Sequence, residues 1–299
     1  RSSSNPIRTK PDTGTWQAWI FNSDLHVIAV AAGWMMGSAA LAGVHFPMAY
    51  LVLASIGAFI VYRVDRLLVD SQEDEINAPE RVLFRQSHRR ALTLVLLIAI
   101  PLALIAIWAL EPAWVLAAAL LGCTGIAYPM RILPGGKRPK DIPWLKTAMI
   151  AFCWVIGGVV LPLLMLGGLV STPLLSIQGV VVIALYRTLY ILPNLITADW
   201  LDREGDLSSG LSSLGGRLTA SGVRTVAMTA LCLALVLIIP LIFWGMPWWL
   251  LTVDVMGLVG LTASVFSVTR TGSGRIVLMD MWAGYPVVTW LLLVIISST

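Results

Sequence analysis

The sequence predicts an all-α integral membrane protein, built as one bundle of about nine transmembrane helices. Three observations lead to this prediction. Of the 299 residues, 58% are hydrophobic and only 12% are charged, which is about half of the roughly 25% that is typical of soluble domains. The mean hydropathy is +0.85. Apolar runs recur along the whole chain, and a run of about 20 residues can cross a bilayer as a helix.

The apolar runs define the predicted spans in chain order. Before the first span, residues 1–25 form a polar or interfacial segment, because "TWQAWIFNSDLHV" mixes aromatic and polar residues as chains do at a membrane surface. No long linker interrupts the runs, so residues 1–299 are read as a single membrane domain whose bundle occupies 26–299. The nine runs are 27–42, 50–67, 91–110, 113–128, 145–166, 176–197, 223–244, 248–269 and 276–297.

The basic residues predict the orientation in the membrane. Lys and Arg occupy the connections after the second, fourth, sixth and eighth runs, whereas "GVHFPMA", "EPAW" and "GMPWW" on the other side contain none. By the positive-inside rule, the N-terminus is cytoplasmic and the C-terminus lies outside. We expect a bacterial inner membrane protein whose active site faces the cytoplasm. The net charge of +4 belongs to this one face, and no basic soluble module indicates nucleic acid as a partner.

Two acidic clusters follow the second and sixth runs on the basic face. In "DWLDREGD", Asp199, Asp202 and Asp206 are three and four residues apart, so a helix that turns about 100° per residue brings them to one side. Asp70 and Asp74 share a side in the same way. Like charges at this spacing repel each other, and oxygen ligands without His or Cys favour Mg²⁺. These five aspartates are the predicted metal-binding and catalytic residues; the alternative is solvated charge at helix ends.

Basic and polar side chains nearby are candidates for binding a diphosphate, since substrate phosphates often complete the shell of a bound Mg²⁺. Arg187 lies inside the sixth run, where an arginine is costly and indicates function. Tyr190 and Asn194 share its helix face. The other candidates flank the acidic clusters or lie in the loop after the fourth run; they are Arg66, Arg81, Arg131, Lys137, Arg138 and Lys146.

Over nearly its whole length, the chain resembles the UbiA superfamily of intramembrane aromatic prenyltransferases. "DWLDREGD" is similar to the second motif of that family, "INAPER" (76–81) to the run after its first motif, and "AYPMRILPGGKR" to its tyrosine–proline–basic loop. The resemblance implies helices around a central cavity, where Mg²⁺ ionises a prenyl diphosphate. A lipophilic acceptor, such as an aromatic compound, a quinone precursor or a tetrapyrrole, then attacks the allylic cation.

The first motif departs from the family pattern N-x-x-x-D-x-x-x-D. When Asp70 and Asp74 occupy the two later positions, Arg66 stands where the family has asparagine. Three functions therefore stay open: prenyl transfer to an acceptor, terpene cyclisation without an acceptor, and a non-catalytic subunit that binds a quinone or a pigment.

For five further residues, the sequence is consistent with two different roles. Asp254 and Asp280 lie within predicted spans and either line a cavity or join helices by hydrogen bonds. Three tryptophans either contact a carbocation through their ring faces or serve packing and interface anchoring, which is the commoner role; they are Trp154, Trp200 and Trp282.

Overall fold

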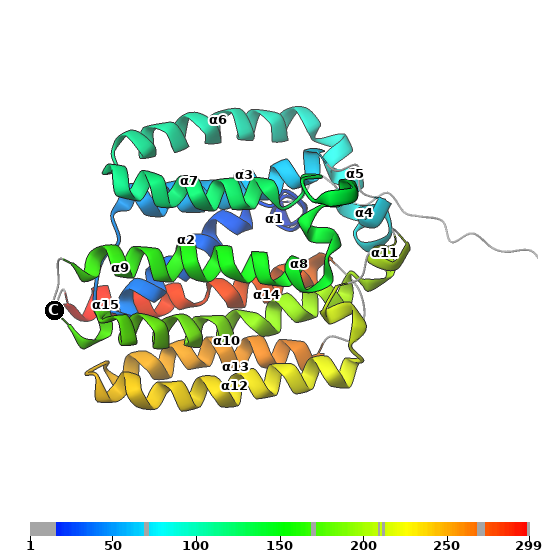
Figure 1. Ribbon diagram of the computed structural model, residues 1–299. Coiled ribbons are helices and arrows are strands. Elements are labelled where there is room, and N and C mark those ends of the chain that lie inside the picture. The colour runs from blue at the N-terminus through cyan, green and yellow to red at the C-terminus, as the bar shows by residue number, and fades with distance from the viewer. Residues whose placement is uncertain are drawn as a thin grey trace, which may run out of the picture.

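The computed structural model describes residues 16–68, 72–168, 172–208, 210, 213–267 and 273–297. Apart from one isolated bridge between Leu133 and Lys137, every regular element in these residues is helical. Figure 1 shows the long helices side by side in a single bundle, with their axes running nearly along one direction. The prediction of an all-α membrane bundle is confirmed.

Seven helical stretches in the described residues are long and apolar enough to cross a membrane. Five are single helices: α3 (Met48–Leu68), α6 (Arg89–Trp108), α10 (Ile177–Leu201), α12 (Ala220–Phe243) and α13 (Trp248–Ser267). The sixth joins α8 (Pro143–Phe152), the π-helix η3 (Cys153–Val160) and α9 (Leu161–Gly167). The seventh joins α14 (Ser273–Gly284) and α15 (Pro286–Ser297).

Two shorter apolar helices complete the correspondence with the sequence. α2 (His26–Leu41) and α7 (Pro112–Ala127) lie at the first and fourth predicted runs. Each of the nine runs thus coincides with one helical stretch, while the count of nine spans and the sides on which the termini lie stay predictions.

The outer surface of the bundle is apolar, as a bilayer requires. On α6, the exposed side chains include many leucines and isoleucines, whereas small residues face α3 around Phe59. Small residues let two helices approach closely, which matters because lipid tails are as apolar as the side chains that they replace. The small residues of α6 at this contact are Ala99, Ala103 and Ala106.

A second close approach holds α2 against the junction of α14 and α15. A Cβ on Gly33 would collide with the carbonyl oxygen of Gly284, and one on Gly37 would collide with Pro286. Glycine is therefore required at both positions, and α2 is fixed next to the last membrane-crossing stretch.

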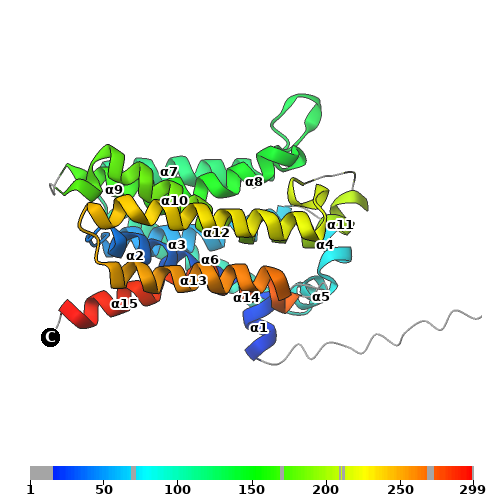
Figure 2. The ribbon, with the colours of Figure 1, turned by 90° about the horizontal axis from the view of Figure 1, so that it is seen from below.

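Three short helices gather at one end of the bundle. Figures 1 and 2 both show α4 (Gln72–Asn77), α5 (Pro79–Ser87) and α11 (Arg203–Ser208) together at that end. The remaining short elements are α1 (Trp16–Asn22), η1 (Pro134–Gly136), η2 (Pro139–Asp141), η4 (Pro173–Leu175) and η5 (Gly215–Arg217). Because α4 follows the second predicted span and α11 the sixth, both acidic clusters belong to this end.

Candidate active site

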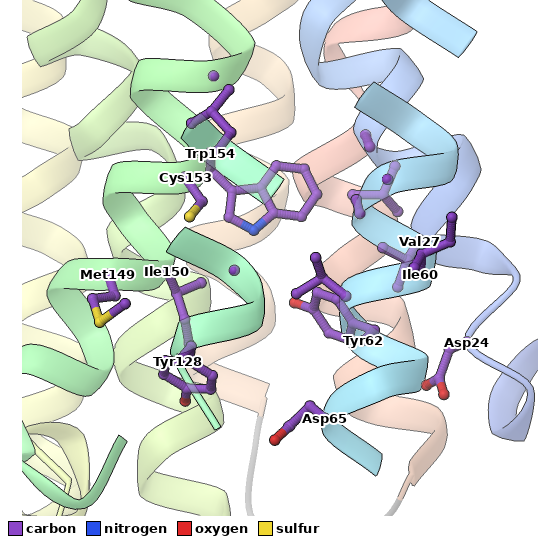
Figure 3. A pocket seen from close by; sticks show the side chains of 18 of the residues that line it. Asp24, Val27, Ile60, Tyr62, Asp65, Tyr128, Met149, Ile150, Cys153 and Trp154 are labelled. Carbon is purple, nitrogen blue, oxygen red and sulfur yellow. The ribbon is translucent and has the colours of Figure 1, made fainter. Parts of the chain in front are cut away.

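A cavity of about 540 Å³ lies inside the bundle and reaches the end where α4, α5 and α11 gather. This volume is within the range of small-molecule sites. Charged residues line one part of the wall, and apolar and aromatic residues line the rest. Figure 3 shows Asp65 toward one end and Trp154 toward the other, with Tyr62 between them.

The second acidic motif contributes three carboxylates to this cavity, and two of them form ion pairs with a lysine of the chain. Asp199 and Asp206 are buried. The ammonium nitrogen of Lys146 lies 3.4 Å from Asp199 Oδ1 and 3.0 Å from Asp206 Oδ2. Thr147 donates its hydroxyl to Asp199 Oδ2 at 2.7 Å. Lys146 thus supplies the counter-charge that two neighbouring carboxylates need.

Asp202 is the carboxylate that remains available. α10 ends at Leu201, so Asp202 is its C-cap and turns into the cavity between α10 and α11. Its side chain accepts no hydrogen bond from the described part of the chain. The pKa of Asp202 is raised to about 6, chiefly because the carboxylate is desolvated in the cavity; Lys146 and Arg81 oppose the rise, and Asp206 and Asp199 add to it. An unpaired, partly desolvated carboxylate has a strong tendency to take up a cation or a proton.

Arg81 is the matching unpaired cation. It projects from the first turn of α5 into the cavity wall and is only 8% exposed. Within the described residues its guanidinium makes no hydrogen bond or ion pair, and its Nε is buried without a partner. Burial lowers the pKa of Arg81, and the neighbouring charge of Arg66 lowers it further. A buried guanidinium without a hydrogen-bonded partner is costly, so this position favours an anionic ligand.

Asn77 joins the two acidic segments into one site. Its side-chain amide donates to the carbonyl of Asp202 at 2.8 Å and accepts from the backbone N–H of Gly205 at 2.8 Å. A Cβ at position 205 would meet the Asn77 amide at 2.5 Å, so only glycine permits this contact. Asn77 lies in the "INAPER" run, but the sequence pattern does not predict this role for it.

The family of the chain follows from a comparison with known proteins. The model of the UbiA prenyltransferase family matches residues 67–284.

This chain belongs to the UbiA prenyltransferase family.

Solved structures of UbiA homologues have the same fold. The apo structure of a UbiA homologue from Aeropyrum pernix K1 has a TM-score of 0.62 at 14% identity, covering 92% of this chain and 98% of that one. The structure of a UbiA homologue from Archaeoglobus fulgidus has a TM-score of 0.55 at 12% identity, with 92% and 98% covered. No curated protein sequence matches the chain significantly.

The first acidic motif of this UbiA protein is engaged in ion pairs with the chain itself. Asp74 lines the cavity and accepts from Arg85 at 2.7 Å. Arg66, at the position of the family asparagine, also lines the cavity and lies 3.0 Å from a carboxylate oxygen of the buried Asp24. Asp70, the other predicted ligand of this motif, lies outside the described residues.

Two lysines from the loop after the fourth predicted run and from the start of α8 line the cavity, and one of them, Lys140, is not among the predicted diphosphate ligands. Lys140 lines the cavity and pairs with Asp65 at 3.1 Å. Arg131 and Lys137 are exposed and do not line it. Arg138 pairs with Asp141 at 2.7 Å, also outside the lining. Of the selected loop cations, Lys146 alone lies at the site, because it sits on the first turn of α8 and not on the loop tip.

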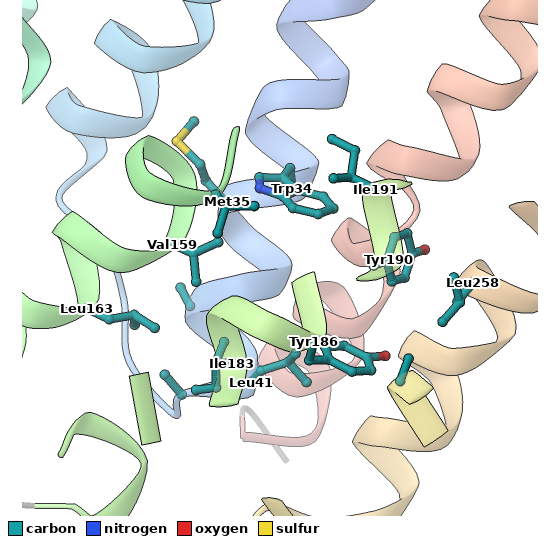
Figure 4. Close-up of a cluster of buried hydrophobic side chains, with 14 of the residues drawn as sticks. Trp34, Met35, Leu41, Val159, Leu163, Ile183, Tyr186, Tyr190, Ile191 and Leu258 are labelled. Carbon is teal, nitrogen blue, oxygen red and sulfur yellow. The ribbon is translucent and has the colours of Figure 1, made fainter. Parts of the chain in front are cut away.

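The structure places Arg187 and Tyr190 in the helix packing, where we had expected substrate contacts. Arg187 is fully buried and donates to both carboxylate oxygens of Asp254, at 2.9 and 3.0 Å. Tyr190 donates to the carbonyl of Trp282 at 3.1 Å. Neither lines the cavity, and Figure 4 shows Tyr190 within the buried cluster. An intramembrane arginine needs a partner acid, and here that partner is on another helix.

The structure distinguishes helix-packing residues from cavity residues among the remaining acids and tryptophans. Asp254 belongs to the helix packing, while Asp280 lines the cavity and accepts from Asn194 at 3.0 Å. Asn194 therefore faces the cavity, but its N–H group is directed at a carboxylate and not at a phosphate. Among the tryptophans, Trp154 lines the cavity and the other two do not.

A π-helical turn shapes the apolar wall. In a π-helix the carbonyl of Gly157 would accept from residue 162, five residues on, but that residue is Pro162 and has no N–H. The hydroxyl of Tyr50 donates to this carbonyl at 2.6 Å, and the indole of Trp34 donates to the carbonyl of Trp154 at 2.9 Å. Side chains from α3 and α2 thus satisfy this stretch of backbone, and the wall stays apolar.

The charged end fits Mg²⁺ in the mode that uses few protein ligands. Among the described residues, no three Asp, Glu, His or Cys side chains lie close enough to form a metal cage. Mg²⁺, however, is usually held by one or two carboxylates and completed by water and substrate phosphates. The carboxylate of Asp202 offers oxygen ligands of this kind, whereas Asp199 and Asp206 are already paired with Lys146.

Proposed function

We propose that this protein is a Mg²⁺-dependent prenyltransferase, which ionises a prenyl diphosphate and transfers the prenyl group to a lipophilic acceptor. The observation that carries the proposal is that Arg81 and Asp202, at the charged end of an otherwise apolar cavity, make no side-chain hydrogen bond or ion pair within the described residues. An amphipathic ligand with an anionic head and a hydrocarbon tail satisfies both parts.

The head group would lie at Arg81. Its guanidinium can form charge-assisted hydrogen bonds to diphosphate oxygens in a fork geometry. Arg66 and Lys140 line the same end, and each is already paired with a carboxylate, so they add positive potential with less freedom to move. The tail would lie along apolar residues such as Val30, Met35 and Ile150.

The reaction begins when the bond between prenyl C1 and the diphosphate oxygen breaks, and its electron pair leaves with the diphosphate. Arg81 and Lys146 stabilise the negative charge that grows there. Mg²⁺, when bound, supplies further Lewis-acid stabilisation of the leaving group. The apolar wall keeps water from the allylic cation, and Trp154 presents an aromatic side chain to it.

A turnover assay tests the proposal. Purified protein in lipid nanodiscs is incubated with Mg²⁺ and farnesyl or geranylgeranyl diphosphate, with and without a mixture of lipophilic phenols and quinols, and released diphosphate and lipid products are measured. Transfer predicts prenylated acceptor. A cyclic hydrocarbon formed without acceptor would indicate cyclisation, and no diphosphate release under any condition would indicate a non-catalytic subunit.

The location is part of the proposal. The charged end of the cavity would face the cytoplasm, because the basic connections lie there in the sequence. A cysteine introduced at the exposed Arg131, in a variant without the three native cysteines, would then react with a membrane-impermeant maleimide in inverted vesicles and not in intact spheroplasts.

A further inference from the structure

Asp280 is an acid in the cavity wall that the binding of a prenyl diphosphate does not use. It belongs to the last membrane-spanning stretch and lines the cavity with its side chain 26% exposed. Its Oδ1 accepts from Asn194 Nδ2 at 3.0 Å, and its Oδ2 lies 3.2 Å from His26 Nε2. An ionised carboxylate has about four acceptor sites, so further acceptor positions remain for a ligand. An intramembrane acid that opens to a cavity is a functional candidate by default.

His26 fixes the number of protons at this acid. Its Nδ1 lies 3.1 Å from the carbonyl oxygen of Ile20, which can only accept, so Nδ1 carries a hydrogen. Its Nε2 faces Asp280. Either Nε2 is protonated and Asp280 is ionised, or Asp280 is protonated and Nε2 accepts. In both cases one proton lies between the two side chains, and neither ring nitrogen is left for a metal ion.

The prenyl diphosphate does not match Asp280. In its ionised form that substrate has no hydrogen-bond donor, and a carboxylate would repel its head group. Asp280 can accept only from an O–H or N–H group. Asp280 nevertheless lies near the charged end, because Arg81 is within electrostatic reach of both Asp202 and Asp280. A donor group bound at Asp280 would therefore lie in the same cavity as the ionising diphosphate.

We propose that Asp280 is the proton acceptor for the second substrate, and that this substrate presents a hydroxyl group. The inference rests on the proposed prenyl transfer. A new bond forms between prenyl C1 and the acceptor oxygen, the C1–O bond to the diphosphate breaks with its electron pair, and the hydroxyl proton passes to the Asp280 carboxylate. Asn194 and His26 are positioning residues that fix the orientation of this carboxylate.

The test compares two acceptors that differ in their need for a base. Wild-type protein and Asp280→Asn are assayed in nanodiscs with geranylgeranyl diphosphate, Mg²⁺ and either 4-hexylphenol or 4-hexyl-2,6-dinitrophenol, which is already ionised at neutral pH. Loss of a general base lowers rates by roughly 10²- to 10⁴-fold. We expect a kcat loss of this size with 4-hexylphenol and a loss below about tenfold with the dinitrophenol. Glu111→Gln, which removes an exposed acid outside the cavity lining, serves as the control and should affect neither.

Three results would overturn the assignment. Equal losses with both phenols would mean that Asp280 acts only through structure. Wild-type protein that releases diphosphate but prenylates neither phenol would exclude a hydroxyl acceptor at this site, while leaving the ionisation step in place. Wild-type protein that releases no diphosphate would remove the proposed function and this inference together. If Asp280→Asn does not fold, His26→Gln carries the same comparison, with a smaller loss expected for 4-hexylphenol only.

Discussion

The side-chain amide of Asn77 accepts a hydrogen bond from the backbone N–H of Gly205 at 2.8 Å. The two residues are far apart in the sequence, and each belongs to a short helix that carries part of one acidic segment. Because the same amide also donates to the carbonyl of Asp202, the position of the unpaired carboxylate depends on a residue from the first segment.

Replacing Gly205 tests this dependence. In Gly205→Ala, the added methyl group would meet the Asn77 amide at 2.5 Å, so α4 and α11 must separate. We expect diphosphate release to fall by roughly 10²-fold, as a misplacement of about 1 Å at a reactive site can cause. Gly168→Ala is the matched control, because a Cβ there meets nothing within 4 Å. Equal activity of the two variants would show that the contact does not position the site.

Neutralising Asp202 should stabilise the protein while it removes activity. The pKa of Asp202 is raised to about 6, above the value of about 3.9 in an unfolded chain. The folded state therefore disfavours the charged form, and stability rises as the pH falls from about 6 toward 4. We expect Asp202→Asn to raise the melting temperature at pH 7.5, by the equivalent of up to about 3 kcal/mol for a shift of about two pKa units, and to leave it unchanged below pH 4. A lower melting temperature at pH 7.5 would contradict this account.

Lys146 should control the affinity of the site for Mg²⁺. Lys146→Met leaves Asp199 and Asp206 without their shared cation, and the two carboxylates then become available to a metal ion. We expect the variant to be less stable in metal-free buffer and to regain stability with millimolar Mg²⁺ more than wild-type protein does, in a thermal melt. Lys137→Met, on the exposed loop, is the control. A Mg²⁺ response like that of wild type would mean that Lys146 does not compete with the metal.

Arg187 and Asp254 should matter for folding and not for substrate binding. Removing one partner of a buried ion pair costs about 3–5 kcal/mol, whereas replacing both by apolar residues is often tolerated. We expect Arg187→Met and Asp254→Leu each to lower the melting temperature strongly. The double variant should recover most of this loss and should have the same KM for the prenyl diphosphate as wild-type protein. A double variant that is stable but has a much higher KM would indicate that Arg187 binds the substrate.

The sequence predicted what depends on local pattern. Hydropathy alone located the helices, because a bilayer demands apolar runs of fixed length. Asp199, Asp202 and Asp206, whose spacing predicts one shared side of a helix, all line the cavity, although α10 ends before Asp202.

Pairings across helices could not be predicted from one sequence. The cost of an intramembrane arginine is the same whether its partner is a substrate or an acid 67 residues away, so the sequence could not show that Arg187 pairs with Asp254. Asn77 and Asp24 were missed because their contacts exist only in the folded chain. A glycine between acidic residues, as in "REGD", is the one local signal of close packing that was present.

Binding of a substrate analogue to Arg81 variants tests the central claim most directly. Titration calorimetry in nanodiscs with geranylgeranyl S-thiolodiphosphate, which resists ionisation, and Mg²⁺ would compare wild-type protein with Arg81→Met and with Arg131→Met. If Arg81 holds the diphosphate, its loss weakens binding by roughly 10- to 10²-fold, since a hydrogen bond to a charged group contributes about 1.5–3 kcal/mol. Arg131→Met should then bind like wild type. Unchanged affinity in Arg81→Met would contradict the account.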